Sequence, residues 1–153
     1  MPPSALAEMF EEAANSFPLE TGGVLMGSWD DHRTIVVTDV IGPGPNAIHG
    51  PHVFDPDQRW QEQRVADVWR LRAGKVAYLG DWHTHPGRSV KPSRLDLEAA
   101  ATIGGSPEAC APRPILMIVG LGPNGSVELG AFVLAKRRLR RTRVEIPRMT
   151  AQA

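Results

Sequence analysis

The order of β-rich runs and amphipathic helical segments along the chain narrows the fold to a few architectures. Apolar residues recur at helical spacing from Ser4 to Phe17, and Pro18 ends this first helix. The complete order is helix, two strands, helix, strand, helix and two strands. Such an order predicts a mixed α/β (α+β) fold in which helices pack on one central sheet. The expected helices are 4–17, 55–74 and 93–105, and the expected strands are 23–27, 34–41, 75–85, 115–119 and 127–134.

The segments around the second helix carry clear boundary signals. Residues 42–52 are rich in glycine and proline, so they are expected to form a loop. Asp55 and Pro56 would supply an N-cap residue followed by proline at the first helical position. Trp60 and Trp69 lie within this helix and are interpreted as core residues.

The length and composition are those of a globular protein. The chain has 153 residues, and we expect a single domain over residues 1–153. Its longest apolar run, Ile115 to Val119, is far shorter than the roughly 20 residues of a membrane helix. The acidic N-terminal segment also lacks the basic and apolar regions of a secretory signal. We therefore expect a cytoplasmic protein without a membrane partner.

Charge is distributed unevenly, although the formal net charge is zero. Residues 1–135 carry 10 basic and 16 acidic side chains, a net charge of −6. Residues 136–153 carry 7 basic and 1 acidic side chains, a net charge of +6. This basic C-terminal segment could bind an acidic partner or nucleic acid, but such runs are more often solvated or paired with their own domain. Nucleic acid is therefore not the expected partner.

The candidate metal ligands are histidines and carboxylates, because the single cysteine, Cys110, excludes multi-cysteine zinc sites and internal disulfides. His83 and His85 are two residues apart at the end of an expected strand, so their side chains share a face. Ser93 and Asp96 are three residues apart in the first turn of the next expected helix, where such side chains are neighbours.

This spacing predicts a zinc site. Two histidines, one aspartate and a water complete a tetrahedral coordination shell with one open position, which is typical of hydrolytic rather than structural sites. Each half of the pattern has an ordinary alternative, because His-x-His can be a surface pair and Ser-x-x-Asp is a common helix capping box. The joint spacing is rare by chance and favours a functional site.

The same residues resemble a known family motif. His83-Thr-His-Pro86 and Ser93-Arg-Leu-Asp96, together with the upstream segment Glu20-Thr-Gly-Gly23, are similar to the JAMM (JAB/MPN+) metalloprotease motif. The resemblance covers the chain from the first helix to the final strands. It implies a JAB/MPN-type fold with cytidine-deaminase-like layering, in which three helices flank a mixed, mostly antiparallel sheet. Small prokaryotic JAB proteins, including the deconjugating peptidases of CBASS antiphage operons, are the most similar members.

The resemblance also implies a role for each residue. His83, His85 and Asp96 would bind Zn²⁺, and Glu20 would be the general base that activates a water. Nothing in its local sequence would otherwise distinguish Glu20 from Glu12. The Ser93 hydroxyl would donate a hydrogen bond to the oxyanion of the tetrahedral intermediate.

Four further residues near the motif have open interpretations. Trp82 either packs beneath the metal site or contacts substrate. Asp81 is interpreted as a solvated strand carboxylate in preference to a hydrogen-bond acceptor for a ligand histidine. His49 and His52 are interpreted as surface residues of segment 42–52 that could line the substrate groove.

The resemblance favours a zinc-dependent isopeptidase or peptidase, a metalloprotease that cleaves after the C-terminal tail of a ubiquitin-like modifier or a conjugated protein. The resemblance implies a CBASS nucleotidyltransferase as one candidate target, which would place the protein in antiphage defence. One alternative keeps the chemistry and removes residues from a sulfur-carrier protein of β-grasp fold. Alternatives of another class are a noncatalytic binding module and a nucleic-acid-associated JAB protein, and the complete ligand set argues against the first of these.

Overall fold

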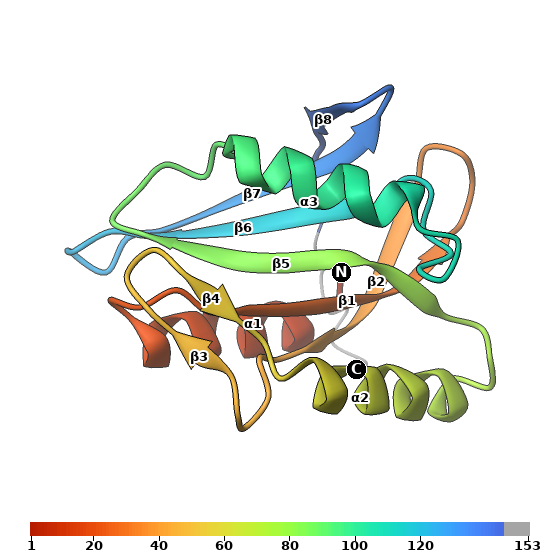
Figure 1. Cartoon of the computed structure of the whole chain (residues 1–153), viewed down its shortest axis with the longest axis horizontal. Coiled ribbons are helices and arrows are strands. Elements are labelled where there is room, and N and C mark those ends of the chain that lie inside the picture. The colour runs from red at the N-terminus through yellow and green to blue at the C-terminus, as the bar shows by residue number, and fades with distance from the viewer. Residues whose placement is uncertain (146–153) are drawn as a thin grey trace, which may run out of the picture.

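The computed structural model describes residues 1–145, and its elements follow the expected order with additional short strands (Figure 1). In chain order the elements are α1 (Pro3–Ser16), β1 (Gly22–Trp29), β2 (Ile35–Ile41), β3 (Ile48–His49), β4 (Phe54–Asp55), α2 (Gln58–Leu71), β5 (Ala77–Pro86), α3 (Arg94–Gly105), β6 (Ile115–Leu121), β7 (Val127–Ala135) and β8 (Arg138–Arg141). The predicted order of helices and strands is confirmed, and β3, β4 and β8 are the strands that the sequence pattern did not predict.

Six strands form one sheet in the order β2-β1-β5-β6-β7-β8, and β3 pairs with β4 in a separate two-stranded sheet. Neighbouring strands of the large sheet are antiparallel except β5 and β6, which are parallel. Parallel neighbours require a crossover connection, and α3 provides it. The sheet is therefore mixed and mostly antiparallel, as predicted.

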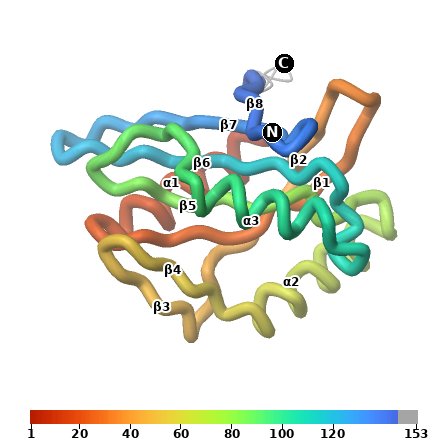
Figure 2. The backbone as a smooth tube through the Cα atoms, turned by 45° about the horizontal axis from the view of Figure 1, so that its top comes forward, coloured from red at the N-terminus to blue at the C-terminus, as the bar shows by residue number. Residues whose placement is uncertain are grey.

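Helices cover both faces of the sheet (Figures 1 and 2). On one face, Met9 and Ala13 of α1 are buried in a cluster with Leu25 and Trp82. On the other face, α2 packs against Val24, and α3 runs along β6 and β7. β6 is buried along its whole length because both of its faces are covered. Within residues 1–145, no helix is long and apolar enough to span a membrane.

A bulge in β5 determines which side chains face which helical layer. The register of β5 against β1 shifts by one residue between Tyr78 and Gly80, so Leu79 is an extra residue. Leu79 and Trp82 consequently both enter the cluster beneath α1, although they are an odd number of positions apart. Gly80 has a φ of 146°, and a Cβ atom there would lie 1.9 Å from the carbonyl oxygen of Ile115. The bulge therefore requires glycine at this position.

The second helix begins two residues later than expected. Asp55 belongs to β4, and the N-cap residue is Asp57, whose carboxylate accepts a hydrogen bond from the Trp60 amide at 3.2 Å. Trp60 packs against the core, but Trp69 is 53% exposed, so its assignment to the core was wrong. The two tryptophans are nine residues apart, which is about 2.5 helical turns and places them on opposite sides of α2.

The sequence predicted a loop over the whole of segment 42–52, but part of this segment is a strand. Ile48–His49 and Phe54–Asp55 pair as the hairpin β3–β4, and the Gly50 amide donates to the Val53 carbonyl at 2.8 Å within its turn. A pairing of two residues in each strand is too short to produce a detectable alternation of apolar and polar residues. This hairpin lies beside the end of β5 that carries the two motif histidines (Figure 1).

Part of the basic C-terminal segment is an edge strand. β8 pairs antiparallel with β7, and Leu139 packs against a cluster that contains Val90 and Phe132. The sequence predicted no strand here because three of the four β8 residues are arginines. Charged side chains are nevertheless common on edge strands. The preferred interpretation was a segment that is solvated or paired with its own domain, and these residues pair with β7 of the same domain. Residues 146–153 of the segment lie outside the described residues.

Candidate metal centre and active site

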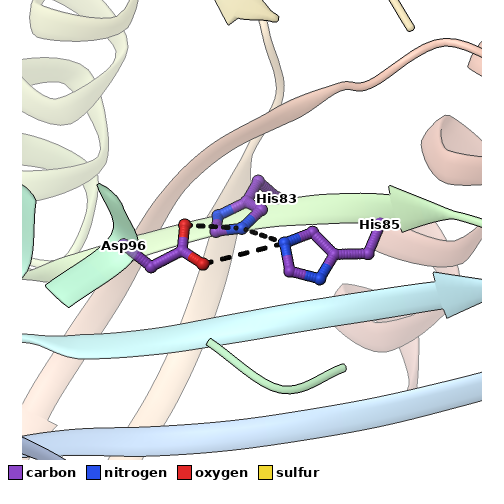
Figure 3. A group of neighbouring side chains, drawn as sticks. All are labelled: His83, His85 and Asp96. Carbon is purple, nitrogen blue, oxygen red and sulfur yellow. Dashed lines mark hydrogen bonds and ion pairs between the residues drawn. The ribbon is translucent and has the colours of Figure 1, made fainter. Parts of the chain in front are cut away.

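The side chains of His83, His85 and Asp96 converge at one point between β5 and α3 (Figure 3). The Nε2 atoms of the two histidines are 3.1 Å apart. Asp96 Oδ1 lies 3.2 Å from Nε2 of His83, and Asp96 Oδ2 lies 3.7 Å from Nε2 of His85. The alternation of β5 places both histidines on the face that carries α3, and the first turn of α3 brings in the carboxylate.

A backbone carbonyl fixes the tautomer of His85. Its Nδ1 atom lies 2.8 Å from the Ser89 carbonyl oxygen, and because a carbonyl can only accept, Nδ1 must carry the proton. Burial is the largest influence on this imidazole and lowers the pKa of His85, which favours the neutral ring. The Nε2 atom of the neutral ring then presents a lone pair to His83 and Asp96. This lone pair is available to a cation bound between the three side chains.

The geometry of these three side chains fits a tetrahedral metal ion. Zinc binds histidine nitrogen and carboxylate oxygen at about 2.0–2.2 Å, so two ligand atoms of a tetrahedral ion lie about 3.3 Å apart. The distances of 3.1 Å between the two Nε2 atoms and 3.2 Å between His83 Nε2 and Asp96 Oδ1 are close to this value, and one ligand atom from each of the three residues lies within 4.8 Å of the others. His83, His85 and Asp96 could therefore hold one divalent metal ion, and three protein ligands would leave one position open.

A capping box anchors Asp96 at the start of α3. The Asp96 amide donates to Ser93 Oγ at 3.1 Å, and the Ser93 amide donates to Asp96 Oδ2. Burial raises the pKa of the Asp96 carboxyl, but the hydrogen bond and charge of His83 and the bonds from Ser93 outweigh it, so the pKa is lowered overall. Asp96 is thereby held in its ionised form. Ser93 Oγ only accepts in the capping box, so its proton is free for another partner.

Glu20 lies across the sheet from His85, just before β1. The Thr84 amide donates to the Thr21 carbonyl at 2.8 Å, and this antiparallel pairing places the preceding residue, Glu20, opposite His85. Paired residues of neighbouring strands share a face, so Glu20 and His85 are on the same side of the sheet. The Glu20 side chain is 14% exposed, and its carboxylate forms an ion pair with Arg88.

Glu12, which the sequence alone did not separate from Glu20, is in a different environment. Its carboxylate accepts hydrogen bonds from the hydroxyls of Thr21 and Ser16, both at 2.8 Å. Glu12 belongs to α1, which covers the face opposite to the histidines. Of these two carboxylates, Glu20 is therefore the one on the face that carries His83, His85 and Asp96.

The three other aromatic candidates occupy different positions. Trp82 is 1% exposed, and its indole N–H donates to the Ile41 carbonyl at 3.1 Å. This burial agrees with packing beneath the site and contradicts substrate contact by Trp82. His49 lies beside Glu20, since its Nδ1 atom is 2.9 Å from the Glu20 carbonyl oxygen. His52 is exposed in the turn of the β3–β4 hairpin.

Asp81 is not the solvated carboxylate that the sequence predicted. Asp81 shares a face with the two histidines by alternation, and the bulge at Leu79 brings Tyr78 to the same face, where Tyr78 Oη donates to Asp81 Oδ1 at 2.9 Å. Burial is the main cause of a raised pKa for Asp81. Its partner is the tyrosine hydroxyl, so the structure does not show Asp81 accepting a bond from either motif histidine.

Two residues of the site, Arg88 and Ser89, were not identified from the sequence. Both lie in the short connection between the histidine pair and Ser93. Their roles depend on contacts to Glu20, far away in the sequence, and to the ring of His85, so no local pattern indicates them. The only available signal was their position inside the motif.

Comparison with known proteins gives relatives that are named as a metalloprotease and an isopeptidase. A probable metalloprotease, y4qB, from Sinorhizobium fredii is 39% identical over 124 residues, which covers 80% of this chain and 76% of the relative. A CD-NTase/cGAS isopeptidase from Enterobacter hormaechei is 28% identical over 131 residues, covering 85% of this chain and 71% of the relative. A solution structure of a Desulfitobacterium hafniense protein superposes with a TM-score of 0.71 at 23% identity, covers 96% of this chain and 93% of that one, and shows the same fold.

The fold and the His-His-Asp centre define a hydrolase of the JAMM type. The sequence profile described as "Prokaryotic homologs of the JAB domain" matches residues 2–142. The chain belongs to this Prok-JAB family. The resemblance inferred from the motif residues is thereby confirmed.

Proposed function

We propose that this protein is a zinc-dependent isopeptidase or peptidase that cleaves after the C-terminal tail of a ubiquitin-like modifier or conjugated protein. The main support is the convergence of His83, His85 and Asp96 on the face of the sheet that also carries Glu20. The strand β5, the helix α3 and the segment before β1 each supply a part of this arrangement. A purely structural metal site would need no further carboxylate on the same face.

The proposed roles of the side chains follow from their chemistry. A bound zinc ion would lower the pKa of a water to about 7 and polarise the scissile carbonyl. Glu20 would accept the proton of that water and return it to the leaving amine. Ser93 would donate its free hydroxyl proton to the oxyanion that forms on the carbonyl oxygen. The Ser89 carbonyl would keep His85 in the tautomer that binds metal through Nε2.

The β3–β4 hairpin is the proposed border of the substrate groove. Its backbone is hydrogen-bonded to the backbone of Glu20, the proposed base, because the Glu20 amide donates to the Gly50 carbonyl at 2.8 Å. Two apolar side chains of this hairpin, Ile48 and Val53, are 61% and 58% exposed. An extended peptide tail would cover them, and His49 and His52 would lie along the same border.

The identity of the substrate is proposed from the relatives. One of them is named as an isopeptidase of CD-NTase/cGAS. A conjugated protein of this kind, in antiphage defence, is therefore the first target to test. Trimming of a sulfur-carrier protein of β-grasp fold uses the same site and is the second.

Exposure of native proteins to the enzyme tests this function directly. The purified protein would be incubated with lysate of its source organism, with and without a metal chelator, and new chain ends would be identified by mass spectrometry. We expect shortened or deconjugated chains that disappear with the chelator and with the His85→Ala variant. Cleavage that persists in both controls, or its complete absence from the untreated sample, would contradict the proposal. The released chains would also distinguish a conjugated target from a sulfur carrier.

Replacing Ser93 tests the proposed oxyanion contact. Ser93→Ala should lower kcat by about 10²–10³, with little change in KM, because one donor to the transition state is lost. The same substitution removes a helix cap at a cost of about 1 kcal/mol, which a thermal melt would detect. Ser93→Gly retains most of the capping preference without the hydroxyl, and Ser93→Thr retains both. A rate loss in the alanine and glycine variants but not in the threonine variant supports the contact. Wild-type rates in all three variants would exclude it.

Replacing the exposed side chains of the hairpin tests the proposed groove. The double variant Ile48→Ser/Val53→Ser should raise KM for the cleaved substrate more than it lowers kcat, because the lost contacts bind the substrate tail away from the reacting bond. Leu71→Ser is the matched control, since Leu71 is 78% exposed at the far end of α2. Steady-state kinetics of the three proteins would decide, and an unchanged KM in the double variant would remove the hairpin from the groove.

A further inference from the structure

Arg88 forms an ion pair with the proposed general base. Its guanidinium donates to Oε1 of Glu20, although 68 positions separate the two residues in the sequence. The Arg88 side chain is 46% exposed, whereas the Glu20 side chain is 14% exposed. A partly exposed ion pair contributes little to stability. We therefore ask what this contact does to the position of the Glu20 carboxylate.

The backbone around Arg88 is fixed to the metal centre. The Gly87 amide donates to the Leu121 carbonyl at 2.7 Å, and the Arg88 amide donates to the His85 carbonyl at 3.2 Å. Two residues later, Val90 is 2% exposed and packs on the sheet. The guanidinium is thus attached to a rigid turn that directly follows the ligand strand, and it can restrain the carboxylate that it binds.

Glu20 needs such a restraint because a carboxylate is itself a good ligand for zinc. Glu20 shares a face with His85 and lies opposite it across the sheet. A carboxylate free to move at this position could become a fourth protein ligand. The coordination shell would then be closed like that of a structural site, without room for a water.

We propose that Arg88 is a positioning residue that keeps Glu20 from ligating the metal, so that the fourth position stays open for water. This inference rests on the proposed zinc site and adds to it a specific consequence for metal affinity. Removal of Arg88 should strengthen zinc binding while it weakens catalysis. A residue with a merely structural role would weaken both.

Zinc affinity, measured by competition with a chromophoric chelator, is a readout that does not depend on catalysis. Arg88→Ala should bind zinc more tightly than the wild type, whereas substitutions just outside a ligand shell usually lower metal affinity, by about 10–100-fold. Arg88→Lys keeps a cation near Glu20 and should remain close to the wild type. In the Glu20→Gln background, Arg88→Ala should change zinc affinity much less, because glutamine is a poor zinc ligand.

The Glu20→Gln background separates this restraint from simple charge repulsion, because repulsion between Arg88 and the metal does not need the Glu20 carboxylate, and a second arginine provides a further control. Arg94 lies two residues before Asp96, is 89% exposed and pairs with Glu98. Arg94→Ala removes a positive charge near the site without touching Glu20, so it should leave zinc affinity nearly unchanged. Thermal melts of the metal-free proteins would verify that every variant is folded.

The possible outcomes distinguish the inference from the proposed function. If the wild type binds zinc and Arg88→Ala binds it equally or more weakly, the restraint is disproved and the zinc site stands. An equal gain in affinity for Arg88→Ala in the wild-type and Glu20→Gln backgrounds would also disprove the restraint. If the wild type binds no zinc, the proposed function itself fails.

Discussion

Glu20→Gln is expected to lower turnover by about 10²–10⁴-fold while zinc content and thermal stability stay at wild-type values. Glutamine has nearly the size and polarity of glutamate, but it cannot accept the proton of the attacking water. The substitution therefore separates proton transfer from metal binding. Measurement of kcat beside elemental analysis of the same preparation would test both parts of this expectation.

Glu12→Gln is the matched control for this experiment. Glu12 lies on the opposite face of the sheet, and a glutamine there can still accept the hydrogen bonds from Thr21 and Ser16. Wild-type turnover is expected for this variant. Retention of full turnover by Glu20→Gln would show that another group is the base, and the site would then be a metal centre of unassigned chemistry.

Loss of a ligand side chain should have the second large effect. The wild-type protein is expected to bind one zinc ion per chain, and His85→Ala and Asp96→Ala should lose most of this metal together with turnover. A ligand bound only by the folded state adds to its stability, by about 2.7 kcal/mol when its free concentration is 100 times its dissociation constant. Elemental analysis and thermal melts at fixed zinc concentration would measure both losses.

Two comparisons make the stability result specific. Addition of a chelator should bring the wild type close to His85→Ala, because the metal contribution is then absent from both. His52→Ala should keep the full zinc content, because His52 is an exposed histidine in the hairpin turn. A wild-type protein without stoichiometric metal, purified without chelators, would overturn the ligand assignment.

The ligand set could be predicted from the sequence because its geometry is local. His83 and His85 alternate along one strand, and Asp96 lies in a helical turn whose capping residue is also visible in the sequence. Periodicity of strands and helices is sufficient to place such residues on common faces. The order of the main helices and strands was predictable for the same reason.

Residues that depend on long-range pairing could not be predicted in this way. Glu20 needed the family resemblance, because its place opposite His85 exists only once β1 has paired with β5. Arg88 was missed for the same reason. β8 was missed because β7 supplies its hydrogen-bonding partner, while its own arginine-rich sequence has no strand pattern.

The pairing of β5 around the bulge at Leu79 limits where residues can be inserted into or deleted from this sequence. Leu79 is extra to the pairing with β1, so its loss would leave the partners and faces of the following residues unchanged, whereas loss of a paired residue such as Asp81 would turn the side chains that follow to the opposite face. His83 and His85 would enter the apolar layer beneath α1, and Trp82 would be turned toward the catalytic side. A substitution within β5 changes one side chain, but deletion of a paired residue would move all these side chains at once. Insertions and deletions should therefore be confined to connections between strands, such as residues 30–34 and 122–126, where they do not change the register of β5.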